Sequence, residues 1–444
     1  MMSETPTRLL IRGGRLLDPA HEIDQTGDLL IENDRIVGIE TDPGRLRPEE
    51  ADRVIDGEGL LVTPGLIDIH VHLREPGPQH EETIATGTEA AGAGGFTTVC
   101  CMPNTSPALD SPEQIEFVRT RAAEAGHCRV FTVACATRER KGRELTDVAA
   151  LARAGAVGIS DDGDVVADAT LMAEALRAAR AKDLCFMQHC QDPDQTMGAS
   201  MNAGPVCERL GLIGWPKAAE ECIVERDIEL NRAIGARYHA QHLSSGASAQ
   251  LIRRARAAGV VVTGEVSPHH LLLTDEACEE MGPMAKMNPP LRTREDIAQL
   301  KEAVADGTIT ILATDHAPHP LASKQRPFAE ASFGIVGVEC ALALYVRALI
   351  EDGVIDWPRL LAMMTIEPAR LVGLDRKGFG QFRIGGPADV TLIDPDESWT
   401  IDMNAFRTTG RNCPFHGWDV TGRAVGTIVG GRIRFDRMQQ RVTG

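Results

Sequence analysis

The sequence lacks the patterns that mark several large classes of protein. No apolar run approaches the roughly 18 residues that a membrane-spanning helix needs, and the first residues lack the apolar core of a signal peptide. No dense run of Lys and Arg is present, and 46 basic against 64 acidic residues give a net charge of −18. We therefore expect neither a membrane nor a nucleic acid as a partner.

The cysteines lack the spacing of a structural metal site. The chain has 11 of them, an odd number, without a CxxC pattern. They are typical of free thiols in a reducing compartment, which favours the cytoplasm over secretion. With 444 residues, 43% of them hydrophobic, the chain is long enough for two or three domains, or for one large barrel with an accessory module.

The middle of the chain alternates between strand-like and helix-like segments. Residues 96–99 and 130–134 have strand character, whereas 113–125 and 169–181 have helical character, the last with Asp168 as its N-cap. This alternation predicts an α/β fold, most simply a (β/α)8 TIM-like barrel over residues 63–375. A doubly wound sheet is the alternative, but the Gly-rich nucleotide loop that usually accompanies it is lacking.

Both ends of the chain have a different pattern of apolar and turn residues. Short apolar segments separated by turn residues occur near the N-terminus, and the same pattern returns after residue 386. Such segments indicate β-strands joined by tight turns. We predict that residues 1–62 and 376–444 combine into one small β-sandwich domain outside the barrel.

A His-x-His pair is the strongest local sign of chemistry. Residues i and i+2 of a strand face the same side, so His70 and His72 can reach one metal ion, although a buried pair without metal is the alternative. Strand ends converge at one mouth of a barrel, where catalytic residues lie. Together with residues that end later apolar runs, the pair predicts a zinc-type hydrolytic site. These further candidates are Asp161 or Asp162, His189, His242 and Asp315.

Longer motifs resemble those of class I dihydroorotases in the amidohydrolase superfamily. They span residues 64–77, 101–105, 160–163, 288–292 and 313–319, and residues 386–390 match the segment that re-enters the β domain in this superfamily. The resemblance implies one or two zinc ions held by His70, His72, Asp162, His189, His242 and Asp315.

The resemblance also implies a reaction. Class I dihydroorotases reversibly cyclise N-carbamoyl-L-aspartate to (S)-dihydroorotate and water, the third step of de novo pyrimidine biosynthesis. Asp315 is expected to move the proton between water and the ring nitrogen, unless it is only a metal ligand. Arg74, placed two residues past His72 on the same strand face, is expected to hold the substrate carboxylate, with a structural arginine as the alternative. Further substrate contacts are expected at Asn104, Asn288, His319, Phe333 and Gly334.

Two other functions compete with this interpretation. Hydantoinases and allantoinases carry a lysine where this chain has the aspartate pair, and no lysine lies near residues 160–163. A catalytically inactive scaffold for aspartate carbamoyltransferase would be expected to have lost metal ligands, whereas all six are present. An active enzyme could still associate with that transferase, and we expect a homo-oligomer. His316 is expected to face away from the site, and residues 320–332 to form a loop at its mouth.

Overall fold

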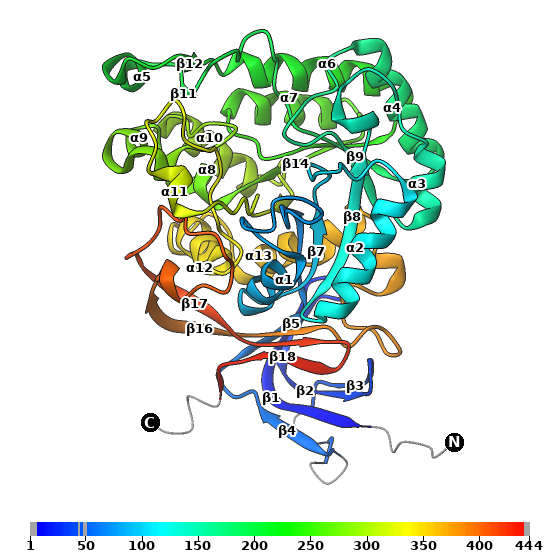
Figure 1. Ribbon diagram of the computed structural model, residues 1–444. Helices are drawn as coiled ribbons and strands as arrows, with labels where there is room; N and C mark the ends of the chain where they lie inside the picture. Colours follow the sequence, from blue (N-terminus) through cyan, green and yellow to red (C-terminus); the bar gives the residue numbers. More distant parts are fainter. Residues whose placement is uncertain (1–6, 43–44, 48–50, 439–444) are drawn as a thin grey trace.

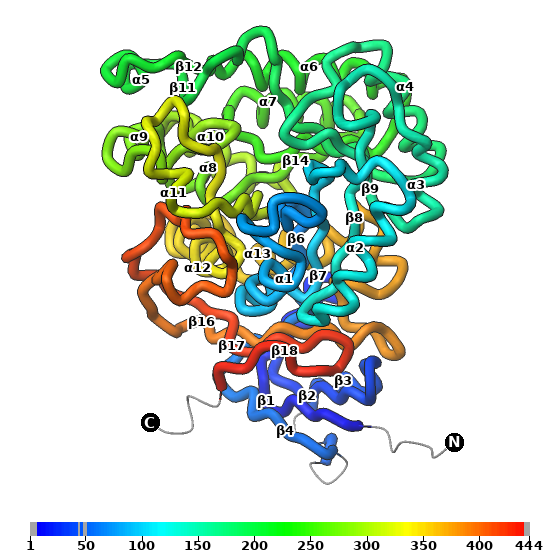
Figure 2. Tube along the Cα trace, viewed as in Figure 1, coloured from blue at the N-terminus to red at the C-terminus, as the bar shows by residue number. Residues whose placement is uncertain are grey.

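The computed structural model describes residues 7–42, 45–47 and 51–438. They form a barrel surrounded by helices, with a smaller sheet packed beneath it (Figures 1 and 2). Two of our expectations concern residues that lie partly outside these ranges. They are the lack of a signal peptide at the N-terminus and the outer limits of the small domain. Within the described part of the chain, no helix is both long and apolar enough to cross a membrane.

Eight parallel strands form the barrel, in sequence order around the sheet. The first and the last strand meet near the barrel mouth, through a bridge between Val71 and His316. This arrangement confirms the predicted (β/α)8 fold and excludes the doubly wound sheet. The strands are β6 (Leu66–Val71), β7 (Phe96–Cys101), β8 (Arg129–Cys135), β9 (Gly158–Ser160), β10 (Cys185–Gln188), β13 (Arg237–Ala240), β14 (Val262–Val266) and β15 (Ile311–Leu312).

Helices separate all successive barrel strands. Helix α4 (Ala169–Ala181) has the predicted bounds, and the Asp168 side chain accepts a hydrogen bond from the Leu171 amide at 2.8 Å. This bond satisfies one of the amides that the first helical turn leaves without a partner. The other principal helices are α1 (Ile84–Ala93), α2 (Pro112–Ala125), α3 (Val148–Ala154), α6 (Ala218–Ile234), α7 (Gly246–Ala257), α10 (Arg294–Ala305), α12 (Ala341–Tyr345), α13 (Trp357–Met364) and α14 (Ile366–Leu371).

The small sheet contains strands from both ends of the chain, as predicted. Its order is β18-β17-β16-β5-β1-β2-β3, with β4 also paired to β1. The two ends join where Val62 pairs with Leu392, and the blue and the orange-red strands lie side by side in Figure 1. The strands are β1 (Arg8–Asp18), β2 (Ile23–Glu32), β3 (Arg35–Glu40), β4 (Arg53–Asp56), β5 (Leu61–Pro64), β16 (Val390–Thr400), β17 (Asp419–Val429) and β18 (Arg432–Asp436).

Several connections at the barrel mouth are long but well packed. The guanidinium of the buried Arg292 donates to the Trp215 carbonyl at 2.7 Å and to the Asn202 side chain at 2.9 Å, which fastens the connection after β10. Residues 320–332 include a short helix whose Lys324 is buried and donates to the Lys286 carbonyl at 2.9 Å. The short elements are β11 (Met201–Asn202), α5 (Pro205–Leu210), β12 (Gly214–Trp215), α8 (Pro268–Leu272), α9 (Glu276–Met281) and α11 (Leu321–Lys324).

Candidate active site

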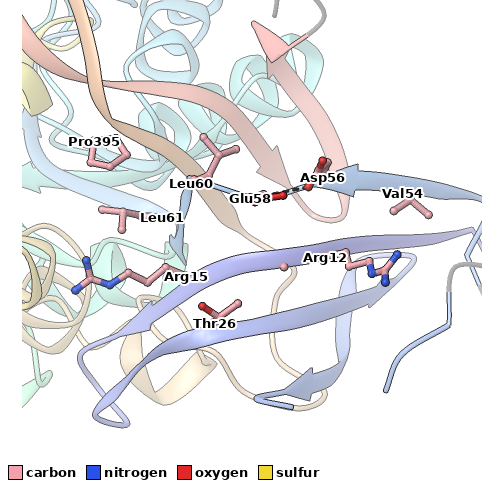
Figure 3. A pocket seen from close by; sticks show the side chains of 11 residues that line it. Arg12, Arg15, Thr26, Val54, Asp56, Glu58, Leu60, Leu61 and Pro395 are labelled. Carbon is pink, nitrogen blue, oxygen red and sulfur yellow. Dashed lines mark hydrogen bonds between the residues drawn. The ribbon is translucent and has the colours of Figure 1, made fainter. Parts of the chain in front are cut away.

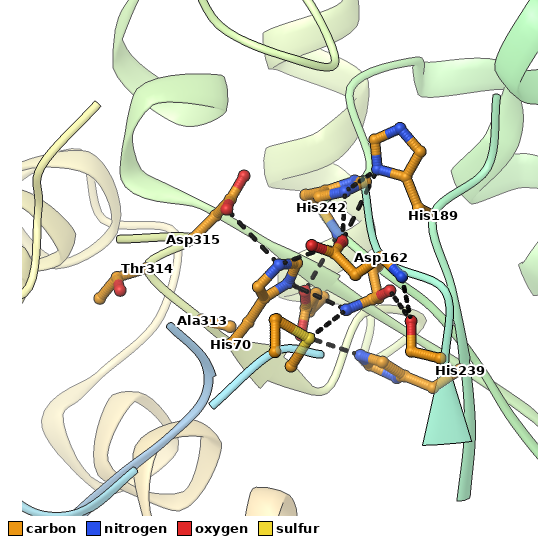
Figure 4. A network of polar contacts seen from close by, with 12 residues as sticks. His70, Asp162, His189, His239, His242, Ala313, Thr314 and Asp315 are labelled. Atoms are coloured by element: carbon orange, nitrogen blue, oxygen red, sulfur yellow. Dashed lines mark hydrogen bonds and ion pairs between the residues drawn. The ribbon is translucent and has the colours of Figure 1, made fainter. Parts of the chain in front are cut away.

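The six predicted metal ligands meet at the carboxyl ends of the barrel strands. Gln188 at the end of β10 pairs in parallel with Ala240 at the end of β13, so the residues that follow these strands lie next to each other. As a result, His189 Nδ1 lies 2.7 Å from His242 Nε2 (Figure 4). His70 lies within β6, while His72, Asp162 and Asp315 follow β6, β9 and β15.

Asp162 occupies the centre of this group. Its Oδ1 lies 3.4 Å from His70 Nε2, 3.6 Å from His242 Nε2 and 3.7 Å from His189 Nδ1. Its Oδ2 lies 3.6 Å from His72 Nε2. All five side chains are buried. One carboxylate therefore faces four imidazoles, which come from the ends of three barrel strands, β6, β10 and β13.

Asp315 approaches the same group from the opposite edge of the barrel. Its Oδ1 lies 3.0 Å from His72 Nε2 and 3.4 Å from His70 Nε2. Burial by itself would raise the pKa of Asp315, and likewise that of Asp162, but His70 and the neighbouring imidazoles outweigh it and lower both pKa values. Both carboxyl groups are therefore ionised at neutral pH, as metal coordination requires.

The donor atoms fit a divalent metal ion. Three triplets of these side chains each place their ligand atoms within 4.8 Å of one another, and Asp162 belongs to two of them. Among the described residues, the buried His70 Nε2 and Asp162 Oδ1 have no hydrogen-bond partner. Buried polar atoms are costly without a partner, and a cation placed among them would satisfy both. Imidazole and carboxylate donors suit zinc and similar ions.

Two residues that are adjacent in sequence to predicted ligands, Asp161 and His316, point away from the ligand group. The Asp161 carboxylate accepts hydrogen bonds from the Thr137 amide, at 2.9 Å, and from the Thr137 hydroxyl. The other neighbour, His316, has its Nε2 3.4 Å from Glu82. Of the two adjacent aspartates, only Asp162 thus reaches the metal-ligand group, and His316 points away from it as expected.

Glu265 on β14 contacts two of the ligands but is absent from the sequence-based prediction. Its Oε1 lies 2.6 Å from His70 Nδ1 and accepts from the His242 amide at 3.1 Å, while its Oε2 lies 3.0 Å from His239 Nε2. These bonds turn the Nε2 atom of His70 toward the ligand group. An acidic residue inside the apolar run 260–266 is the sequence signal that could have revealed it. His239, on the other side of this carboxylate from His70, is also buried.

Glu265→Gln should weaken metal binding by roughly 10- to 100-fold, because an amide supports the His70 ring less strongly than a carboxylate does. Metal content after dialysis against buffers of defined free zinc would measure the change. Glu302→Gln on the surface of α10 is the matched control and should retain wild-type affinity. Equal metal affinity in the two variants would contradict this role for Glu265.

A cavity of about 140 Å³ opens directly over the ligand group. Five of the six ligands line it, while His70 lies fully buried beneath. All six predicted substrate contacts also line this cavity: Arg74, Asn104, Asn288, His319, Phe333 and Gly334.

Arg74 reaches the cavity by a different route from the predicted one. Strand β6 ends at Val71, and Arg74 has a φ of 57°, so it lies beyond the strand in a left-handed conformation and not on the strand face shared with His72. Its Nη2 lies 3.3 Å from His319 Nε2, and its Nε lies 3.5 Å from Glu81. Positive φ is also found at His242 and Asp315, and such strained conformations are common at functional sites.

Asn104 contacts two of the predicted metal ligands. Its Oδ1 lies 2.8 Å from His72 Nδ1, and its Nδ2 donates to Asp162 Oδ2 at 3.4 Å. Asn104 therefore holds the His72 ring in place in addition to facing the cavity.

A larger hollow, of about 880 Å³, lies on the small sheet (Figure 3). Arg12, Arg15, Asp56 and Glu58 lie along it, but Arg15 is paired with Asp24 outside the hollow. In Figure 3 the labelled side chains do not converge on one point. The volume of this hollow therefore does not make it a catalytic site.

Comparison with known proteins identifies the family. A model of dihydro-orotase-like proteins matches residues 59–248. A dihydroorotase from Syntrophotalea carbinolica is 44% identical over 428 residues, covering 96% of this chain and 99% of that protein. A dihydroorotase from Geobacter metallireducens is 43% identical over 430 residues, covering 97% and 100%. The chain belongs to the dihydroorotase family.

Solved structures of other cyclic amidohydrolases share the fold of this dihydroorotase family member. The L-hydantoinase from Arthrobacter aurescens superposes with a TM-score of 0.86 at 23% identity, covering 97% of this chain and 96% of that one. The dihydropyrimidinase from Brevibacillus agri gives 0.83 at 22% identity, covering 97% and 95%. Membership of the dihydroorotase family identifies the chain as a hydrolase, and its clustered donors agree with the metal dependence of the family.

Proposed function

We propose that the chain is a class I dihydroorotase, which interconverts N-carbamoyl-L-aspartate and (S)-dihydroorotate in the third step of pyrimidine biosynthesis. The observation that carries this proposal is the presence of Arg74 and the metal-ligand group in one cavity. Dihydroorotate bears a carboxylate beside the cyclic amide, and a guanidinium suits the carboxylate while a metal suits the amide. The aspartate at the fourth strand, where hydantoinases carry a lysine, supports the same substrate.

We assign zinc, as one or two ions, to His70, His72, Asp162, His189, His242 and Asp315. When bound, zinc supplies Lewis acidity that polarises the amide carbonyl and acidifies water. In the hydrolytic direction Asp315 takes the proton from the attacking water and passes it to the departing ring nitrogen.

The remaining cavity residues bind and orient the ring. Arg74 holds the carboxylate, with its own guanidinium placed by His319 and Glu81. The Asn288 Oδ1, buried and without a hydrogen-bond partner among the described residues, is available to an amide N–H of the substrate. The backbone at Phe333 and Gly334, which also line the cavity, contacts the ring.

The purified, zinc-loaded chain should hydrolyse dihydroorotate, with hydantoin as the comparison substrate. Turnover of hydantoin without turnover of dihydroorotate would overturn the proposal in favour of a hydantoinase. If neither is hydrolysed, the assay is repeated with aspartate carbamoyltransferase present, and continued inactivity would favour the scaffold function.

We place the enzyme in the cytoplasm, as a homo-oligomer able to associate with the transferase. All 11 cysteines are free thiols, and ten of them are buried, which agrees with a reducing compartment. We also propose residues 63–375 as the catalytic domain.

A further inference from the structure

One wall of the active-site cavity is supported by chain from outside the barrel. Between β16 and β17, residues 401–418 leave the small sheet and lie along the barrel beside α12 (Figures 1 and 2). Ile401 and Phe415 from this segment pack in one apolar cluster with Ile335 and Val336 of the barrel. The segment is therefore firmly attached to the barrel and not only to its own sheet.

Asn412 is the polar centre of this attachment. It is fully buried, and its Nδ2 donates to the Ala317 carbonyl at 2.8 Å and to the Gly334 carbonyl at 2.9 Å. Its Oδ1 accepts from the His319 amide at 2.9 Å. Two carbonyls require the NH2 group and one amide requires the oxygen, so these partners fix the orientation of the side chain.

The three partners of Asn412 all line the substrate cavity. His319 contacts the Arg74 guanidinium, and Gly334 has a φ of 130°, a conformation that favours glycine. A Cβ atom at residue 334 would lie 2.8 Å from the Ala317 carbonyl oxygen, so these two stretches of wall already touch closely. Any change in the hydrogen bonds between them would move groups that face the substrate.

We propose that Asn412 is a positioning residue, which fixes the positions of His319 and Gly334 relative to Arg74 so that the cavity fits the carboxylate-bearing ring. The inference rests on the proposed function for the identity of that ring. It makes the C-terminal segment part of the active site, although its own side chains do not touch the reacting atoms.

Asn412→Asp tests this role, because it keeps the size of the side chain and the acceptor for His319 but turns a second oxygen toward two carbonyls. We expect kcat/KM for dihydroorotate to fall by roughly 10- to 100-fold, mainly through KM, with metal content unchanged. Asn412→Ser removes the carboxamide and with it all three hydrogen bonds, without adding a charge, and should also raise KM. It also provides the test if the aspartate variant does not fold.

Thr408→Val is the matched control in the same segment. The buried Thr408 hydroxyl bonds to Glu82 and accepts from the Gly410 amide at 3.2 Å, away from the three partners of Asn412. This variant should lose stability but retain the wild-type KM. If the Asn412 variants lose stability and keep the wild-type KM as Thr408→Val does, the residue is merely structural and the inference is overturned.

Hydrogen exchange separates this inference from the proposed function, since it needs no turnover. The His319 amide should exchange faster in Asn412→Ser, which has lost the oxygen that accepts its hydrogen bond, and at the wild-type rate in Thr408→Val. Faster exchange in a chain that does not act on dihydroorotate would leave Asn412 as a positioning residue for another substrate. Unchanged exchange at His319 would overturn the inference whatever the substrate is.

Discussion

Asp315→Asn is expected to lower kcat for dihydroorotate by roughly 10²- to 10⁴-fold, the contribution that a positioned general acid or base makes. The amide has the shape of the carboxylate, so its oxygen can still face His72, 3.0 Å away in the wild-type chain. What it loses is the ability to take a proton from water and return it to the ring nitrogen. Rate assays at saturating dihydroorotate and zinc would measure the effect.

Metal analysis of Asp315→Asn shows whether its lower rate results from impaired proton transfer or from loss of metal. Asp161→Asn is the matched control, because Asp161 is adjacent in sequence to the predicted ligand Asp162, is buried, and bonds to Thr137 instead of the cluster. A variant at Asp315 that keeps its metal and loses its rate supports the proton-transfer role. A rate that falls only in proportion to lost metal would make Asp315 a ligand alone.

The barrel and the convergence of His and Asp side chains at its mouth could be predicted because each has a local signature. The period of apolar residues marks strands and helices, and His70, His189, His242 and Asp315 each stand in or just after an apolar run. Once the fold is a parallel barrel, its topology brings the strand ends to one mouth. The convergence of the ligands on Asp162 therefore follows from the order of the strands.

The supporting residues could not be predicted in the same way, because their roles arise from tertiary contacts. Asn412 bonds to Ala317, which is 95 residues away in the sequence, and no local pattern connects the two. Glu265 on β14 supports His70 on β6, although the two residues are 195 positions apart in the sequence. The φ of Arg74 depends on how the chain turns after β6, which the alternating strand pattern does not encode. Periodicity predicts elements and their faces, but not which polar groups meet between them.

Arg74→Met should raise the KM for dihydroorotate strongly, by roughly 30-fold or more, while leaving the metal in place. Removing one partner of a buried charge pair costs about 2–5 kcal/mol, because the other charge is left without compensation. The Arg74 side chain is only 12% exposed, so water cannot easily replace the guanidinium beside a bound carboxylate. Steady-state kinetics with parallel metal analysis would measure both quantities.

A cyclic substrate analogue that lacks the carboxylate makes the test of Arg74→Met specific. Dihydrouracil presents the same cyclic amide, so its affinity should be nearly equal for the wild-type chain and for Arg74→Met. Arg253→Met on α7, whose guanidinium pairs with Asp306 at 2.6 Å, controls for loss of an arginine elsewhere and should leave both affinities unchanged. An equal loss of affinity for the two rings would mean that Arg74 shapes the cavity without binding the carboxylate. A loss confined to dihydroorotate would show that Arg74 binds the carboxylate of this substrate. Arg74 would then also account for the preference of a chain with a net charge of −18 for an anionic substrate.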